Sequence, residues 1–114
     1  MLMEYLIMSV LAELETQMER LYWNKNQKEM QSPFENTGAE YANDTFYVRA
    51  YNWGDDDGGC NFKYKDLSIW WYKHFRRGLE WTYKGERNTP IPSEFLAEML
   101  DDCIMSVQID WDII

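Results

Sequence analysis

The chain has 114 residues, of which 46% are hydrophobic, and its formal net charge is −9. This length predicts one domain over residues 1–114, with a modest core. The charge disfavours non-specific binding to nucleic acid or to an anionic membrane, and it favours docking on a basic protein surface. No stretch reaches the ~18 consecutive apolar residues that a membrane helix needs.

Residues 4–30 are expected to form one long amphipathic helix. Apolar side chains recur in this stretch at steps of three and four residues, and most of the charged ones fall off that stripe. Ser32 and Pro33 then end the helix, because the residue before a proline resists the α conformation. Residues 34–44 follow as a polar connector without periodicity.

Three strands are expected in the middle of the chain. Residues 45–53 alternate in the manner of a strand, and one face is predicted to carry Tyr47, Arg49, Tyr51 and Trp53. A glycine- and aspartate-rich turn at 54–59 leads to a second strand at 61–73. The apolar positions of this strand switch phase near residue 66, which predicts a bulge. The third strand is expected at 79–84.

The second helix is predicted over residues 93–107, following Pro90 and Pro92. The tail, residues 108–114, fits either a strand or a continued helix. The predicted fold class is therefore α+β: a three-stranded antiparallel β-meander flanked by a long N-terminal helix and a C-terminal helix.

The charges are sorted along the sequence. Seven Lys/Arg stand against three acids between residues 61 and 89, whereas residues 90–114 hold six acids and no Lys or Arg. On the predicted second helix, like charges four residues apart cost about 0.2–0.5 kcal/mol each, and a cationic partner would remove that strain. The alternative is a plain solvated face. The predicted partner-binding carboxylates are Glu94, Glu98, Asp101, Asp102, Asp55, Asp56 and Asp57.

Cations and rings interleave in the second strand and in the turn after it, a mixture typical of surfaces that bind single-stranded nucleic acid. This alternative site comprises Trp70, Tyr72, Lys73, Arg76 and Arg77. The net charge argues against it, so nucleic acid is not the favoured partner. The rings can equally be core, with the lysines balancing nearby acids. A homodimer is a further alternative, because a bare aromatic sheet face usually meets a partner or a second copy.

No pattern in the sequence indicates an enzyme, a metal or a cofactor. The single histidine, His74, lies in a basic turn and belongs to no catalytic motif. The three adjacent aspartates of the 54–59 turn cannot all face one calcium ion. Cys60 and Cys103 form no CxxC motif, which predicts two reduced thiols in a cytoplasmic protein. The apolar N-terminal stretch lacks a basic leader and a cleavage site, so no signal peptide is expected.

The whole chain resembles the small acidic orphan proteins of phages and mobile elements in low-GC bacteria. The stretches that resemble them most are residues 22–38 and 61–67. The best characterised members of this broad class are anti-CRISPR proteins, several of which are compact α/β domains. The resemblance, in size, charge and element order, implies a non-enzymatic inhibitor in the cytoplasm of a bacterial host. Such an inhibitor would block the basic nucleic-acid channel of a nuclease by nucleic-acid mimicry. The resemblance assigns no functional residue.

Overall fold

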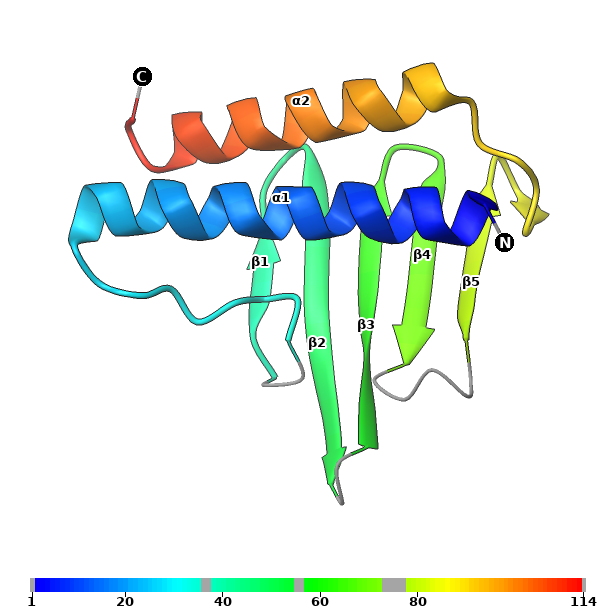
Figure 1. Ribbon diagram of the computed structural model, residues 1–114, viewed down its shortest axis with the longest axis horizontal. Coiled ribbons are helices and arrows are strands. Elements are labelled where there is room, and N and C mark those ends of the chain that lie inside the picture. Colours follow the sequence, from blue (N-terminus) through cyan, green and yellow to red (C-terminus); the bar gives the residue numbers. More distant parts are fainter. Residues whose placement is uncertain (1, 36–37, 55–56, 73–77, 114) are drawn as a thin grey trace. The chain divides into compact units, whose positions relative to one another are not determined.

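The computed structural model describes residues 2–35, 38–54, 57–72 and 78–113 (Figure 1). The chain divides into a helical unit, residues 1–30 and 91–114, and a sheet unit, residues 31–90. The fold is α+β with an antiparallel sheet, as expected, but the sheet has six strands rather than three. That residues 1–114 fold as a single domain stays a prediction.

In the helical unit, α1 spans Leu2–Asn26 and ends four residues earlier than predicted. It stops because Gln27 adopts a positive φ of 55°, which turns the chain out of the helix. The Gln27 N–H still donates to the Trp23 carbonyl at 2.7 Å. The predicted apolar stripe is confirmed, and its fully buried positions are Ile7, Leu11, Leu14 and Met18.

The second helix, α2, spans Ser93–Asp110 and begins after Pro92, whose backbone is extended. It continues three residues beyond its predicted end, so the first residues of the tail are helical and form no strand. The Trp111 N–H then donates to the Val107 carbonyl at 3.0 Å. The buried stripe of α2 consists of Leu96, Met99, Cys103 and Val107.

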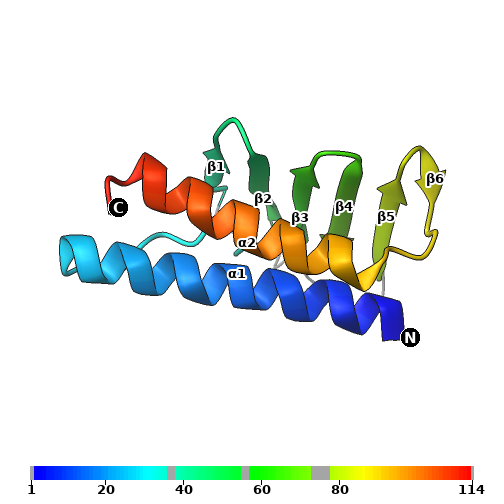
Figure 2. The same ribbon diagram turned by 90° about the horizontal axis from the view of Figure 1, so that it is seen from above.

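The two helices lie side by side and run in the same direction (Figures 1 and 2). Their C-terminal ends therefore meet, and the rings of Tyr22 and Trp111 pack edge to face there with centroids 5.4 Å apart. This parallel arrangement has an electrostatic consequence, because each helix carries about half a negative charge at its C-terminus.

In the sheet unit, each strand pairs antiparallel with the next one in sequence, so the strand order is that of the chain (Figure 2). The strands are β1 Glu40–Ala42, β2 Phe46–Gly54, β3 Asp57–Tyr64, β4 Leu67–Tyr72, β5 Leu79–Tyr83 and β6 Glu86–Arg87. The predicted first and third strands are confirmed as β2 and β5 with small shifts of their ends.

The predicted second strand is wrong as a single element. Residues 61–73 contain a hairpin in which Tyr64 of β3 pairs with Leu67 of β4. Lys65 has a positive φ of 48° and starts the tight turn between them. The phase switch in the apolar pattern is therefore a change of strand and not a bulge, since a two-residue turn restarts the alternation on the next strand.

The two outer strands of the sheet were missed because they are short and polar. β1 lies in the predicted connector and is joined to β2 by a turn at Asn43, whose Oδ1 accepts hydrogen bonds from the N–H groups of Thr45 and Phe46 at 2.8 and 3.0 Å. β6 lies between the predicted third strand and the predicted second helix, where Lys84 and Gly85 both have positive φ and reverse the chain. Short edge strands give a second molecule little backbone to pair with.

The register separates the side chains of the sheet into two faces. The buried face supplies the core of the sheet unit: Phe46, Val48, Ala50, Cys60, Phe62, Tyr64, Leu67, Ile69 and Trp81. Here the Trp81 indole donates to the Thr89 carbonyl at 2.6 Å. The opposite face, called the aromatic face below, carries Glu40, Ala42, Tyr47, Arg49, Tyr51, Trp53, Gly59, Asn61, Lys63, Ser68, Trp70, Tyr72, Glu80, Thr82 and Arg87. The predicted division of the first strand between two faces is thus confirmed.

Candidate functional site

Three of the predicted acidic residues form an exposed line on α2, which we call the acidic stripe: Glu94, Glu98 and Asp101. They follow one another at steps of four and three residues, so they lie on the same side of the helix. At 1.5 Å per residue they span about 10 Å along the helix axis. The fourth predicted carboxylate on this helix, Asp102, is only half-exposed and lies off this line.

The acidic stripe belongs to a unit with a strong charge imbalance. The helical unit holds eleven Asp/Glu against three Lys/Arg, whereas the sheet unit holds nine against eight. Within α2 there is no Lys or Arg, and Glu94 accepts a hydrogen bond from the Ser93 hydroxyl at 3.4 Å. Glu98 and Asp102 also interact with other groups of the chain. Nearly all of the net charge of the protein therefore resides on the helical unit.

Cys103, on the buried side of α2, is held in its neutral form. Burial, with a further contribution from the charge of Asp102, raises the pKa of the Cys103 thiol to about 12. Cys60 is also buried, on β3, and its thiol faces the Pro33 carbonyl at 3.9 Å. Because only the thiolate is a good nucleophile, the raised pKa of Cys103 makes this thiol a poor one.

The predicted acidic tip at residues 55–57 is described only in part. Asp57 begins β3, is half-buried, and accepts a hydrogen bond from the Gly58 N–H at 2.9 Å through Oδ1. This carboxylate therefore helps to shape the start of the strand. Asp55 and Asp56 lie outside the described residues, so their place in a partner-binding surface stays a prediction.

Two of the predicted aromatic residues, Trp70 and Tyr72, form a cluster on the aromatic face together with Tyr51 and Trp53. We call these four rings the aromatic cluster. Trp53 lies nearly parallel to Tyr51 and to Trp70, with interplanar angles of 22° and 29° and centroids 6.2 and 6.0 Å apart. Tyr72 stands edge-on to Trp70 at 6.0 Å. The rings are half-buried except for Trp53, which is 48% exposed.

A glycine lies beneath the aromatic cluster and gives the rings their space. Gly59 of β3 is paired with Tyr51 on one side and with Tyr72 on the other. A Cβ at this position would stand 2.8 Å from the Trp71 carbonyl oxygen and 3.3 Å from the Trp53 ring. Only glycine therefore lets the Trp53 ring lie across β3.

Charged side chains border the aromatic cluster on the same face. The Arg49 guanidinium lies over the Tyr51 ring at 5.1 Å and forms an ion pair with Glu40 at 3.7 Å. On the far strands, Arg87 pairs with Glu80 at 3.4 Å. Two carboxylates of this face, Glu40 and Glu80, are thus matched by arginines, and the exposed Lys63 adds a further positive charge.

Tyr47 lies two residues before Arg49 on β2 and on the same face of the sheet. Partial burial raises the pKa of Tyr47, and a hydrogen bond with Tyr51 adds to the rise, while one with Arg49 opposes it. The phenol of Tyr47 therefore stays neutral at neutral pH, and it can both donate and accept a hydrogen bond.

The rest of the predicted basic site, Lys73, Arg76 and Arg77, lies outside the described residues, as does His74. Tyr51 and Trp53 were not among the predicted site residues, although their alternation on the first strand had placed them on one face. The four rings come together only because Gly59 of the neighbouring strand leaves room for them. The sequence pattern of one strand does not show which residue of another strand pairs with it.

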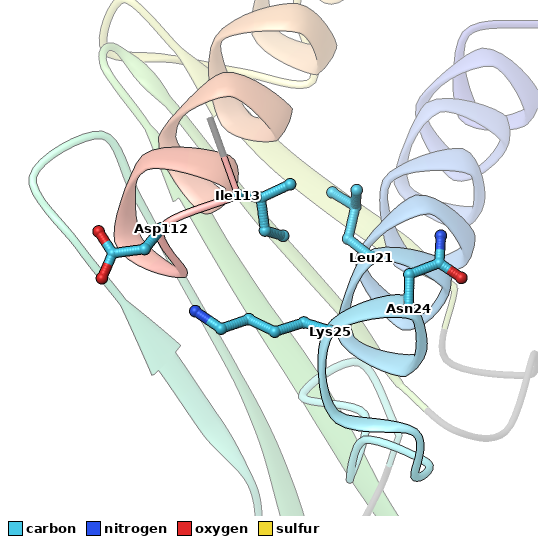
Figure 3. A pocket seen from close by; sticks show the side chains of 5 residues that line it. All are labelled: Leu21, Asn24, Lys25, Asp112 and Ile113. Atoms are coloured by element: carbon cyan, nitrogen blue, oxygen red, sulfur yellow. The ribbon is translucent and has the colours of Figure 1, made fainter.

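A small cavity lies between the C-terminal ends of α1 and α2 (Figure 3). Its volume is about 280 Å³, and it is lined by Leu21, Asn24, Lys25, Asp112 and Ile113. Lys25 extends across it towards the segment that carries Asp112 (Figure 3). The lining combines one cation with one carboxylate and two aliphatic side chains, and it offers no pairing of a nucleophile with a base.

Within residues 2–35, 38–54, 57–72 and 78–113, no group of three or more His, Cys, Asp or Glu side chains is arranged to hold a metal ion. Of the two helices described, neither is long and apolar enough to cross a membrane. Comparison of the chain with protein-family models, with curated proteins and with solved structures gives no match.

Proposed function

We propose that this protein is a non-enzymatic inhibitor that binds a partner protein through the acidic surface of its helical unit. The acidic stripe carries this proposal: three exposed carboxylates in one line on a helix that has no Lys or Arg. Spacings of about 6 and 4.5 Å along the axis follow from the helix geometry. A cationic surface would thus meet a row of carboxylate oxygens held on one helix, in place of the row of phosphate oxygens along a nucleic-acid backbone.

The electrostatic field of the helical unit supports the same function. Eleven acids against three bases attract a positively charged surface from a distance and raise the rate of encounter. The parallel helices add to this field, because their negative dipole ends lie together near Asp110 and Asp112. The last turn of α2 contains no base that would offset them.

Apolar side chains continue the acidic stripe towards the C-terminus of α2. Met105 follows Asp101 by four residues and Ile109 follows Met105 by four more, and these two side chains are 50% and 59% exposed. A plain solvated helix face has no need of such side chains. A protein partner would bury them, and their desolvation would supply affinity beyond the screened attraction between charges.

The partner class follows from the charge and from the anti-CRISPR-like character of the sequence. RNA-guided nucleases hold their heteroduplex in a positively charged channel that reads backbone and shape. Carboxylates placed in that channel would compete with phosphates for its arginines and lysines. We therefore propose a nuclease of this kind, or another bacterial defence protein with a basic channel, as the partner, and the bacterial cytoplasm as the place of action.

The test is inhibition of DNA cleavage by a Cas9-type nuclease loaded with its guide. The parent protein should inhibit cleavage, less so at higher salt, and the variant Glu94→Gln/Glu98→Gln/Asp101→Asn should lose most of that inhibition. A matched control removes three exposed carboxylates of the sheet unit, at Glu35, Asp66 and Glu86, and should inhibit nearly as well as the parent. If the stripe variant inhibits as well as the parent, or the control loses as much, the stripe does not carry the function.

A further inference from the structure

We propose that the aromatic face of the sheet unit binds the unpaired bases of a single-stranded nucleic acid. This activity goes beyond the proposed inhibition and uses different residues, on a different unit of the chain. The net charge of −9 argues against nucleic acid only if the charge is spread evenly. It is not, because the sheet unit carries nine acids against eight bases while the helical unit holds the rest of the excess.

The pairing of β2, β3 and β4 arranges this face in rows that cross three strands. One row holds Tyr51, Gly59 and Tyr72, and the next holds Arg49, Asn61 and Trp70. Successive rows lie about 6.6 Å apart, since each strand residue advances ~3.3 Å. Rings and a cation thus alternate over an area of the sheet that is large enough for more than one base.

The exposed ring of Trp53 is the stacking element of this surface. Because Gly59 lacks a Cβ, the Trp53 ring lies across β3 within 6.0 Å of Trp70 and 6.1 Å of Tyr72. The neighbouring rings hold it in place and leave 48% of its surface open to solvent. A ring that is fixed before binding loses little entropy when a base stacks on it.

The cations of this face are placed for phosphates. Glu40 and Glu80 are already paired with Arg49 and Arg87, so they do not present bare negative charge to a ligand. Lys63 lies in the row beyond Arg49 and is exposed. A nucleic-acid strand whose bases stack on the aromatic cluster would bring its phosphate backbone past Arg49 and Lys63.

The composition of the face favours nucleic acid over a second copy of the chain. Among its described ladder positions, Ala42 is the one aliphatic residue and Gly59 the one glycine, and the others are aromatic, charged or hydroxyl- and amide-bearing. Lysine and glutamate, which this face carries at Lys63, Glu40 and Glu80, are depleted from the cores of interfaces between protein chains. Duplex is disfavoured as well, because its stacked bases offer no free face to the rings.

The experiment is a tryptophan-fluorescence titration with a thymidine oligonucleotide of about 12 nucleotides, a length within the usual site sizes. An abasic strand of equal length and the corresponding duplex are titrated in parallel. The thymidine strand should quench the fluorescence, and the other two should bind much more weakly. If the strand contacts two cations through its phosphates, the affinity of the parent should fall about sevenfold between 50 and 200 mM salt. The affinity of Lys63→Ala, which keeps one of these contacts, should fall about threefold over the same range.

Two tryptophan variants assign the binding to this face. Trp53→Ala should weaken binding by about 5- to 150-fold, the range for loss of one stacked base. Trp23→Ala is the matched control, because Trp23 lies on α1 and is 47% exposed against 48% for Trp53. Circular dichroism of both variants verifies that they fold. Trp53→Phe keeps a ring and should recover most of the affinity.

Three results would overturn the proposal: no quenching by the thymidine strand, equal affinity for the abasic strand, or equal affinity of Trp53→Ala and the parent. Light scattering identifies the competing occupant. A dimer that becomes a monomer in Trp53→Ala would assign the face to a second copy of the chain. None of these results bears on the acidic stripe, so this proposal and the proposed inhibition fail independently.

Discussion

Replacing Gly59 by alanine perturbs the aromatic face at its most crowded point. The new Cβ would lie 2.8 Å from the Trp71 carbonyl oxygen, 3.3 Å from the Trp53 ring and 3.6 Å from the Trp70 ring. The shortest of these contacts is to a backbone atom, which cannot rotate away as a side chain can. β3 and β4 must therefore separate locally, or the ladder between them must distort.

The magnitude follows from two opposing effects. Overpacking costs about 1–3 kcal/mol, while the alanine restricts the unfolded chain and returns about 0.4–1 kcal/mol. A net loss of about 1–2 kcal/mol in the free energy of unfolding is expected. For 114 residues, an unfolding entropy of about 2.1 cal/mol/K per residue converts this loss into a Tm lowered by roughly 4–8 °C.

Urea denaturation followed by tryptophan fluorescence measures the loss, and near-ultraviolet circular dichroism reports on the packing of the rings. Gly85→Ala is the control, because Gly85 has a φ of 82° and nothing within 4 Å of the added Cβ. It should lose stability through backbone strain and keep the ring signal unchanged. If Gly59→Ala is as stable as the parent and keeps the same near-ultraviolet spectrum, the account of the aromatic cluster is wrong.

Three further predictions concern the core and the turns. Trp81→Phe removes the indole bond to the Thr89 carbonyl and some buried volume, so it should lower the free energy of unfolding by about 1–3 kcal/mol in urea; an unchanged midpoint would contradict this. Asn43→Ala removes the acceptor of two backbone N–H groups and should cost about 1 kcal/mol in the same assay, whereas no cost would show that the turn forms without it. Because the pKa of Cys103 rises from 9.0 to about 12 on folding, its contribution to stability is complete below about pH 9 and is lost as the pH rises towards 12. The stability difference between the parent and Cys103→Ala should therefore shrink between pH 8 and about pH 11, and a constant difference would refute the assignment.

The helices were the part of the fold most accessible from sequence. Their buried stripes, such as Leu96, Met99, Cys103 and Val107, recur at helical steps over several turns, and a long periodic signal tolerates errors at its ends. The end of α1 was misplaced because a positive φ at Gln27 stops the helix, and glutamine carries no sequence signal for that conformation.

The strand count was the part that failed, for two physical reasons. The turn at Lys65 and Asp66 contains no glycine or proline, so the phase switch in the apolar pattern was read as a bulge within one strand. β1 and β6 span only three and two residues, which is too few for an alternating pattern of apolar and polar residues to be recognised. They form because β2 and β5 offer backbone N–H and C=O groups with which they pair. Short edge strands of this kind are set by tertiary pairing more than by local composition.

For the candidate sites, sequence reasoning identified the kinds of residue better than their grouping. Spacing predicted that Glu94, Glu98, Asp101 and Asp102 all lie on the side of α2 opposite its apolar stripe, and the structure leaves the first three exposed. Spacing could not show that Asp102 is half-buried. The aromatic cluster depends on which residue of β3 faces Tyr51, and that residue, Gly59, becomes significant only when the register is known.

The most direct measurement for the proposed inhibitor is its association rate constant with a guide-loaded Cas9-type nuclease, followed by stopped flow between 50 and 200 mM salt. Steering by the helical unit predicts a rate that falls steeply with salt, and a rate at low salt about tenfold or more slower for Glu94→Gln/Glu98→Gln/Asp101→Asn. An association rate that is insensitive both to salt and to removal of these three carboxylates would contradict the proposal that the protein works by presenting its acidic helix to a cationic channel.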